Sequence, residues 1–199
     1  MRGYQAAILA VTGLIIAAIA AFVLYGGGGY GGRGTAAVGG PFTLVDHTGK
    51  QRTNRDFQGA FALIYFGYTF CPDVCPTALQ VMSQAIDRLS PEAQKKITPV
   101  FITIDPERDT VKELGVYVDN FHPRMVGLTG TAQQIAKAAR AYRVYYGRSK
   151  SGGNDTSDYL MDHSSIVFLL DPKGAYVTHF THATPPEKMA EMLKIKMGS

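Results

Sequence analysis

Hydrophobic residues dominate the first part of the chain almost to the exclusion of charge. Residues 4–25 are nearly all apolar, and Arg2 is followed by no charged side chain until Arg33. As a helix, this stretch would extend ~33 Å at about 1.5 Å per residue, which is enough to cross a hydrocarbon core of roughly 30 Å. A cleaved signal peptide has a shorter apolar region, of about 7–15 residues. The pattern therefore predicts an uncleaved transmembrane anchor within residues 1–25.

A glycine-rich stretch follows the apolar one. Nine of the fifteen residues from 26 to 40 are glycine, a composition that is typical of flexible linkers. The remainder of the chain is long enough to bury one proper hydrophobic core. We therefore predict a linker at 26–40 and a single folded domain at 41–199.

Within 41–199, the hydrophobic pattern alternates between that of strands and that of helices. Residues 41–53 alternate apolar and polar around a turn, which predicts a β-hairpin. Residues 61–66 and 97–104 are continuous apolar runs, typical of strands buried on both faces. Between these two runs, apolar residues recur at helical spacing from 79 to 89. The first half of the domain therefore reads as a hairpin, a strand, a helix and a strand.

The second half of the domain continues this alternation. Thr110 with Glu113, and Thr131 with Gln134, have the spacing of capping boxes, so a helix is predicted to begin after each threonine. The other expected elements are a strand near 125–128, a strand or core segment at 142–146, a polar surface loop at 147–158, a hairpin at 166–180 and a helix at 185–197. Strands alternating with helices and a closing hairpin predict an α/β fold, a three-layer sandwich around a mixed central sheet.

Charge excludes one class of partner and suggests a compartment. The net charge of +4 falls to +2 beyond Arg33, where 18 basic residues face 16 acidic ones, and no basic run is longer than Lys95-Lys96. This pattern gives no support for nucleic-acid binding. Arg2 and the amino terminus favour a cytoplasmic start for the anchor, so the domain is expected outside the cytoplasm. Outside the cytoplasm, thiols oxidise unless another protein or reductant keeps them reduced.

Cys71 and Cys75 are the only cysteines in the chain and have three residues between them. Such a pair can form a disulfide, bind a metal or attack another protein's disulfide. A disulfide that closes so short a loop stabilises little, because its benefit grows with loop length. The pair lies between a buried strand and the helix that follows, and the amino terminus of a helix stabilises a thiolate. The pattern therefore favours reactive sulfur over a structural disulfide.

One of the five histidines differs from the others in its predicted place. His163 comes directly before a buried strand, and in a thioredoxin-like fold that strand start lies beside the helix terminus that carries the thiols. It would complete a set of two cysteines and one histidine. The adjacent Asp162 is expected either to orient the imidazole ring or to be exposed. His47 and His122 are expected at the surface, and His179 and His182 are expected to be solvated.

Several segments, in order and with the expected gaps, make the resemblance to a known family specific. "YFGYTFCPDVCP", "ITIDPERDT", "VGLTGT", "ARAYRVYY" and "DYLMDHSSIVFLLDPKG" look like the Sco/SenC family of copper-binding proteins. The resemblance implies a thioredoxin-like fold with an added amino-terminal hairpin, and copper held by Cys71, Cys75 and His163. A transmembrane helix before the domain also fits the family. Because the apolar stretch begins at residue 4 and leaves no room for a mitochondrial targeting sequence, we expect a bacterial member, anchored in the inner membrane with its domain in the periplasm.

The resemblance also implies a function. A copper metallochaperone of this family would assist assembly of the dinuclear CuA centre of cytochrome c oxidase subunit II, and would receive copper from a periplasmic donor. Two thiolates and an imidazole can hold Cu(I) or Cu(II). Such a protein is not expected to be an enzyme in the usual sense.

Two other functions remain open at this stage. A thiol–disulfide oxidoreductase would keep the CuA cysteines reduced, with Cys71 as the attacking thiol and Cys75 as the resolving one. A zinc site is the other, although structural zinc normally has four protein ligands. In the segment "DPERDT", Asp105, Arg108 and Asp109 are explained by turn and helix-cap chemistry, with a role at the rim of the site as the alternative.

Overall fold

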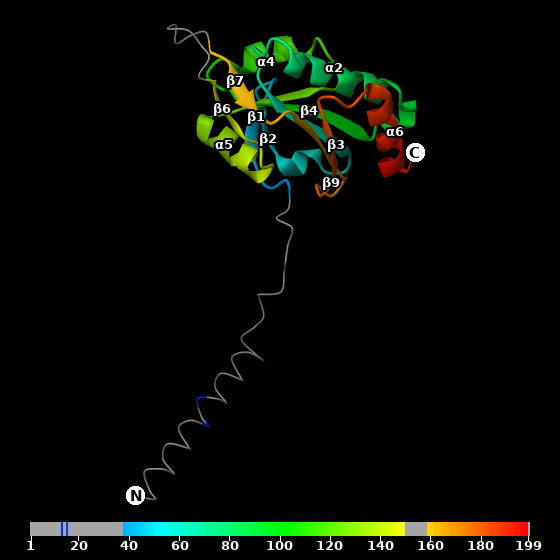
Figure 1. Ribbon diagram of the computed structural model, residues 1–199, viewed down its shortest axis with the longest axis horizontal. Helices are drawn as coiled ribbons and strands as arrows, with labels where there is room; N and C mark the ends of the chain where they lie inside the picture. The colour runs from blue at the N-terminus through cyan, green and yellow to red at the C-terminus, as the bar shows by residue number, and fades with distance from the viewer. Residues whose placement is uncertain (1–12, 14, 16–37, 150–158, 199) are drawn as a thin grey trace, which may run out of the picture. The chain divides into compact units, whose positions relative to one another are not determined.

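The computed structural model describes residues 13, 15, 38–149 and 159–198 (Figure 1). The chain divides into two compact units, Met1–Ala36 and Ala37–Ser199. Among the described residues, none of the helices combines the length and the apolar character that a membrane crossing requires. The predicted anchor at 1–25 falls almost wholly outside these residues, as do most of the predicted linker and most of the predicted loop at 147–158.

The second unit is built on a seven-stranded mixed sheet with the strand order β2-β1-β5-β4-β3-β8-β9. The strands are β1 (Thr43–Asp46), β2 (Gln51–Thr53), β3 (Phe61–Gly67), β4 (Ile97–Thr103), β5 (Val126–Thr129), β8 (Ile166–Leu170) and β9 (Tyr176–Thr181). Strands β3, β4 and β5 run parallel to one another, and β8 and β9 continue the sheet antiparallel beyond β3. The predicted hairpin forms from β1 and β2, and β1 pairs antiparallel with β5. Strand β3 therefore lies inside the sheet, between β4 and β8, and its carboxyl end leads to the cysteines.

Helices cover both faces of this sheet. They are α2 (Val74–Asp87), α3 (Pro91–Gln94), α4 (Val111–Val118), α5 (Ala132–Ala141) and α6 (Pro186–Met197), with a 3-10 turn, η1, at Asn54–Phe57. Right-handed crossovers from β3 to β4 and from β4 to β5 place α2 and α4 on the same face, where α6 packs against α2. On the other face, Tyr142 at the end of α5 packs against Phe66 and Phe168. The predicted three-layer sandwich with a mixed sheet is thus confirmed.

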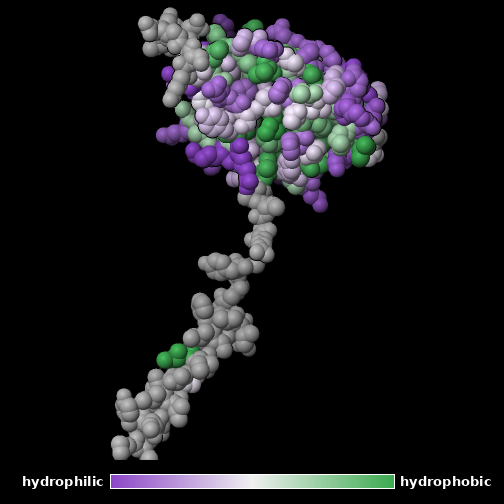
Figure 2. All heavy atoms as spheres, viewed as in Figure 1, coloured by the Kyte–Doolittle hydropathy of each residue, from purple (hydrophilic) through white to green (hydrophobic). Residues whose placement is uncertain are grey.

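Apolar side chains of the sheet and helices form one buried core, which includes the large side chains of Tyr65, Phe66 and Phe101. The face of the unit seen in Figure 2 is mostly hydrophilic, and its hydrophobic residues lie in small separate groups. Polar and apolar positions along the chain therefore separate as the sequence pattern predicts.

Two strands lie outside the main sheet. β6 (Tyr146–Arg148) and β7 (Met161–His163) pair antiparallel as a second, two-stranded sheet, with Tyr146 opposite His163. The prediction of a strand or core segment at 142–146 is confirmed, because Tyr142 and Val144 are buried in the core and Tyr146 begins β6. The surface loop predicted from residue 147 begins too early. Gly147 and Arg148 belong to β6 because they pair with Asp162 and Met161. Sequence periodicity does not reveal so short a strand.

His122 corrects another prediction, because its side chain is buried and not at the surface. Its Nδ1 accepts a hydrogen bond from the backbone N–H of Arg124 at 3.1 Å. Burial lowers the pKa of His122 below its ordinary value. Next to Pro123 at a helix end, the histidine closes the loop between α4 and β5, a role that its position in the sequence does not show.

A buried carboxylate anchors the loop that carries the first cysteine. Asp109 is fully buried. It accepts hydrogen bonds from the backbone N–H of Thr69 at 3.0 Å, the hydroxyl of Thr69 at 2.6 Å and the hydroxyl of Thr103 at 2.6 Å. Thr103 ends β4, and Thr69 lies two residues before Cys71. The carboxylate therefore holds the start of the cysteine loop against the neighbouring strand.

This anchor predicts that Asp109→Ala lowers the free energy of unfolding by about 2–4 kcal/mol, because it leaves up to three buried donors without an acceptor at about 1–3 kcal/mol for each. Chemical denaturation at pH 7 measures the loss. Asp119→Ala, at an exposed carboxylate after α4, is the matched control and should change stability by less than about 0.5 kcal/mol. Equal effects of the two substitutions would contradict the anchoring role.

Candidate metal centre

The two cysteines lie where β3 turns into α2. The backbone N–H of Cys71 donates to the carbonyl of Tyr68 at 3.3 Å, so the loop turns tightly before the helix. Cys75 lies in the first turn of α2, and its N–H donates to the sulfur of Cys71 at 3.4 Å. Pro76 occupies the same turn, as predicted, where its missing N–H costs nothing.

Close packing behind the thiols fixes the sulfur of Cys75. Gly67 ends β3, and a Cβ atom at this position would lie 2.8 Å from the sulfur of Cys75. Any larger residue would push that sulfur out of place. The Cys75 side chain is fully buried, whereas Cys71 retains 8% exposure. The more accessible of the two is thus Cys71, the thiol expected to attack in the oxidoreductase hypothesis.

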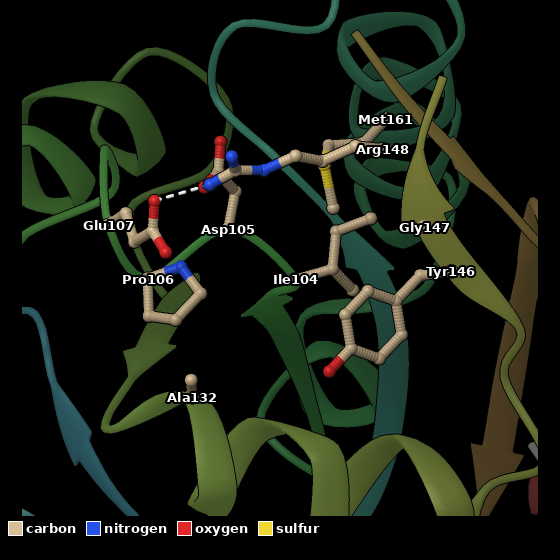
Figure 3. Close-up of a pocket in the computed structure, with 9 residues that line it drawn as sticks. All are labelled: Ile104, Asp105, Pro106, Glu107, Ala132, Tyr146, Gly147, Arg148 and Met161. Atoms are coloured by element: carbon tan, nitrogen blue, oxygen red, sulfur yellow. Dashed lines mark hydrogen bonds and ion pairs between the residues drawn. The ribbon is translucent and has the colours of Figure 1, made fainter. Parts of the chain in front are cut away.

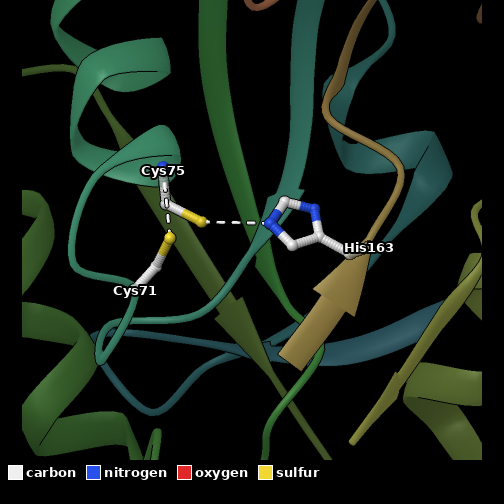
Figure 4. A group of neighbouring side chains, drawn as sticks. All are labelled: Cys71, Cys75 and His163. Carbon is white, nitrogen blue, oxygen red and sulfur yellow. Dashed lines mark hydrogen bonds between the residues drawn. The ribbon is translucent and has the colours of Figure 1, made fainter. Parts of the chain in front are cut away.

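His163 reaches the thiols from the last position of β7. Its Nε2 lies 3.3 Å from the sulfur of Cys75, although the two residues are 88 positions apart (Figure 4). The rings of Tyr65 and Tyr68 meet the imidazole edge-on, with centroids 6.0 and 6.1 Å away. Its Nδ1 lies 3.3 Å from the carbonyl oxygen of Ser164. When the proton is on Nδ1, that N–H donates to the carbonyl and Nε2 has a free lone pair for a metal. When the proton is on Nε2, that N–H can donate to a thiolate sulfur.

Together, Cys71, Cys75 and His163 form a compact set of donor atoms. Their sulfur and nitrogen atoms all lie within 4.8 Å of one another. Ligands bound to one ion at about 2.0–2.3 Å are themselves about 3.3–4 Å apart, so small side-chain movements would bring all three onto a single ion. Within the described ranges, this is the one group of three or more cysteine, histidine or acidic residues spaced to hold a metal ion.

The two thiols differ in their affinity for a proton. The pKa of Cys71 lies well below its usual value, chiefly because the Cys75 thiol donates a hydrogen bond to it, and His163 adds a second. Burial opposes this shift without cancelling it. The pKa of Cys75 is raised, because it keeps the proton that it donates to Cys71 and because it is buried. The hydrogen bonds from Cys75 and His163 therefore favour a thiolate at Cys71. The thiolate predicted for the pair does not form at Cys75, which remains a thiol until a metal or oxidation removes its proton.

The other residues considered from the sequence lie away from this set. Asp162 is exposed, and the alternation of side chains along β7 points it away from His163. Asp73 is also exposed and accepts a hydrogen bond from Thr77. His179 and His182 are exposed at and after β9, as expected, and His179 is hydrogen-bonded to Tyr176 at 2.6 Å.

Sequence reasoning missed one contact of the centre. The Tyr65 hydroxyl donates to the sulfur of Cys75 at 3.8 Å and lies 3.1 Å from the hydroxyl oxygen of Ser165. Burial raises the pKa of Tyr65, so the hydroxyl keeps its proton. Tyr65 lies in a continuous apolar run that predicts only a buried strand. The polar end of a tyrosine within such a run was the one available signal.

Comparison with known proteins places this geometry in context. The chain is 43% identical to the mitochondrial SCO2 homolog of Bos taurus over 166 residues, which cover 82% of this chain and 62% of that protein. A crystal structure of Arabidopsis thaliana ScoI with copper bound is 38% identical and has a TM-score of 0.75, covering 82% of this chain and all of that one. The structure of Bradyrhizobium japonicum ScoI with copper bound is 40% identical with a TM-score of 0.73, covering 80% and 99%.

These similarities confirm the thioredoxin-like fold that the resemblance implies. They extend over the whole described domain, although the chain spans less than two thirds of the length of the bovine relative. Residues 31–198 match the SCO1/SenC family. With a CxxxC pair at a helix terminus, a histidine across the fold and this match over most of its length, the chain belongs to the SCO1/SenC family.

Proposed function

We propose that this protein is a copper metallochaperone that binds copper through Cys71, Cys75 and His163. The observation that carries the proposal is the gathering of three donor atoms within 4.8 Å, from two segments far apart in the sequence. Relatives of known structure, ScoI of Arabidopsis thaliana and of Bradyrhizobium japonicum, hold copper. By membership of the family, the recipient would be the CuA centre of cytochrome c oxidase subunit II.

The donor set suits copper better than zinc. Soft thiolates favour Cu(I), and imidazole is a good ligand for both copper states. Structural zinc normally takes four protein ligands, whereas the group of donors found within the described residues has three members. A three-ligand set also leaves a place for a recipient's thiolate to enter before the chaperone's own ligands leave. Such stepwise ligand exchange suits delivery better than storage.

The cellular setting follows from the sequence. The apolar stretch at 4–25 and the glycine-rich stretch at 26–40 support a domain that is tethered to a membrane. A start on the cytoplasmic side would place the domain outside the cytoplasm. We propose a location in the inner membrane of a bacterium, with the domain in the periplasm, where it would receive copper from a donor and meet subunit II. Asp162, which is exposed, is not part of the proposed copper site.

A second candidate function, disulfide reduction, rests on the difference in pKa and burial between the two thiols. A reactive Cys71, which is buried but retains 8% exposure, with a protonated and fully buried Cys75 behind it is the arrangement of an attacking and a resolving thiol. The Cys71 thiolate would attack a disulfide of the target, and Cys75 would then release the target by closing a disulfide with Cys71. The net reaction moves two electrons to the target, which gains two thiols. This reductase activity would prepare the CuA cysteines for metal.

Copper titration tests the ligand set. In the full chain, reduced and solubilised in detergent under anaerobic conditions, Cu(I) should bind in a ratio of one to one. Cys71→Ser and Cys75→Ser should each abolish stoichiometric binding, because one thiolate with one imidazole is a poor Cu(I) site. His163→Ala should weaken Cu(II) binding at least tenfold, about 1.4 kcal/mol or more. Competition with a chromophoric chelator measures each affinity.

His182→Ala is the matched control for this titration, because His182 is exposed and lies outside the donor set. It should bind copper like the unaltered chain. The proposed site is wrong if either serine variant retains full stoichiometry, or if His182→Ala weakens binding as much as His163→Ala.

Alkylation tests the unequal thiols. Because the pKa of Cys71 is lowered, its thiolate is already formed at mildly acidic pH, and its rate of reaction with iodoacetamide should change little between pH 5.5 and 7.5. An ordinary thiol with a pKa of about 8.5 would react roughly 100-fold faster at the higher pH. Cys75 should stay unmodified in the folded protein. Mass spectrometry of quenched samples follows both residues, and Cys75→Ala should restore a steep pH dependence at Cys71.

A single variant, His163→Ala, distinguishes the two candidate functions. His163→Ala removes a copper ligand and leaves both thiols, so it should lose copper transfer to a reduced apo CuA domain but still reduce an oxidised one. Copper content and free thiols of the CuA domain, re-isolated after mixing, are the two measurements. Unchanged copper transfer by His163→Ala would count against the proposed ligand set. Failure of the unaltered, reduced chain to generate thiols would exclude the reductase function.

A further inference from the structure

Arg108 lies between the two segments that carry the donor atoms. Its guanidinium carbon is 3.7 Å from the ring centroid of Tyr159, 4.6 Å from that of Phe70 and 5.8 Å from that of Tyr68. Phe70 and Tyr68 belong to the loop that ends at Cys71. Tyr159 begins the described segment that leads to His163. One side chain therefore contacts both halves of the site without being part of it.

Directional hydrogen bonds hold this arginine in place. Nε donates to Oδ2 of Asp105 at 2.5 Å, and Nη1 donates to the carbonyl oxygen of Tyr159 at 2.9 Å. The hydroxyl of Tyr159 donates to the other carboxylate oxygen of Asp105 at 2.7 Å. Asp105, Arg108 and Tyr159 thus form a closed ring of interactions, and the side chains of the ion pair are only 4% and 15% exposed. Turn and cap chemistry, the interpretation of "DPERDT" from sequence, does not account for this ring.

The small sheet has no strand pairing with the seven-stranded sheet, so side-chain contacts such as this link position it. β7 pairs with β6, outside the seven-stranded sheet. A cavity of about 210 Å³ is lined by the loop after β4 and by the small sheet, with Asp105 and Glu107 from the loop and Tyr146, Arg148 and Met161 from the sheet (Figure 3). Close packing therefore does not fix β7 on this side. The salt bridge across the cavity, from Arg148 to Glu107, is exposed at both ends and adds little.

Tyr68 extends the link from Arg108 to the imidazole itself. The Tyr68 hydroxyl accepts a hydrogen bond from the backbone N–H of Met161 at 3.2 Å, and its ring packs edge-on against His163. By contrast, Cys75 is set by α2 and by its packing on β3. Cys71 is held by the N–H of Cys75 and by the Asp109 anchor at Thr69. Loss of the link would therefore displace the histidine and leave both thiols in place.

We propose that Arg108 is a positioning residue that holds the His163 segment against the Cys71 loop and so sets the imidazole within reach of a metal bound by the two thiols. This role rests on the copper function proposed above. Arg108 acts through Tyr159 and Tyr68 and does not contact the metal. A planar guanidinium can stack on rings and donate hydrogen bonds in its own plane at the same time, which a lysine ammonium cannot do. Lysine at this position would not substitute for it.

The test compares Arg108→Gln and Arg108→Lys with Arg88→Gln in the full chain. Arg88 is the matched control, because it forms an exposed ion pair with Glu187 between α2 and α6, with no contact to either donor segment. Both Arg108 variants should lower Cu(II) affinity at least tenfold and shift the electron paramagnetic resonance spectrum of bound Cu(II) toward that of His163→Ala. Cu(I) affinity, which depends mainly on the thiolates, should change less than threefold. Arg88→Gln should leave all three measurements unchanged.

A double variant distinguishes positioning from a general effect on the fold. In a His163→Ala background, Arg108→Gln should cause no further loss of Cu(II) affinity, because residues that act through one group are not additive. A further tenfold loss in that background would overturn the proposal, as would a wild-type spectrum and affinity in the single Arg108 variants. Tyr159→Ala, which removes the ring and keeps the Arg108–Asp105 pair, should give the same shift if an Arg108 variant does not fold.

If the proposed copper function is wrong, the variants should give a different pattern of results. If His163→Ala itself left Cu(II) affinity and the spectrum of the chain unchanged, the proposed ligand set would fall, and the role of Arg108 with it. If His163→Ala changed both and the Arg108 and Tyr159 variants changed neither, only the positioning role would be wrong.

Discussion

The contact between the Cys75 sulfur and the His163 imidazole joins two parts of the domain that are built separately. Cys75 is fixed by α2 and by the close approach of Gly67 on β3. His163 belongs to the two-stranded sheet and reaches the sulfur at 3.3 Å. The β3–α2 junction alone supplies only a pair of thiols, and the two-stranded sheet alone supplies only a histidine. The donor set exists because the fold brings these two parts together. The surrounding tyrosines and Arg108 contribute by holding the imidazole beside the two sulfurs.

Metal delivery and disulfide reduction make the same demand on this site. Both require an electron pair on the Cys71 sulfur that is available at neutral pH, and both require Cys75 to give up its proton at a later step. The hydrogen bond between the two thiols meets this demand, because it lowers one pKa at the expense of the other. What distinguishes the two functions is the histidine, which adds a third donor for a metal and has no part in disulfide exchange.

The sequence predicted those parts of the fold whose signals are local. Continuous apolar runs identified β3 and β4, capping residues such as Thr131 marked the helix starts, and His163 stood out because it precedes a buried strand. Features that arise from contacts between distant segments were not visible. His122 is buried beside the end of α2, where its Nε2 lies 3.8 Å from Oδ1 of Asp87. β6 is a strand only because β7 lies beside it. Arg108 looked like part of a turn, since its aromatic neighbours come from segments far away in the chain.

The separateness of the two-stranded sheet also bears on how domains of this kind diversify. Within the described chain, β6 and β7 share no strand pairing with the seven-stranded sheet, so their side chains can change without altering the register of the core strands. A lineage that lost the imidazole would retain a complete thioredoxin-like domain with a reactive thiol pair. One that placed another donor there would acquire a different cargo. The third donor can thus change at the periphery of the domain, while the thiol pair stays in the core and the fold is unaltered.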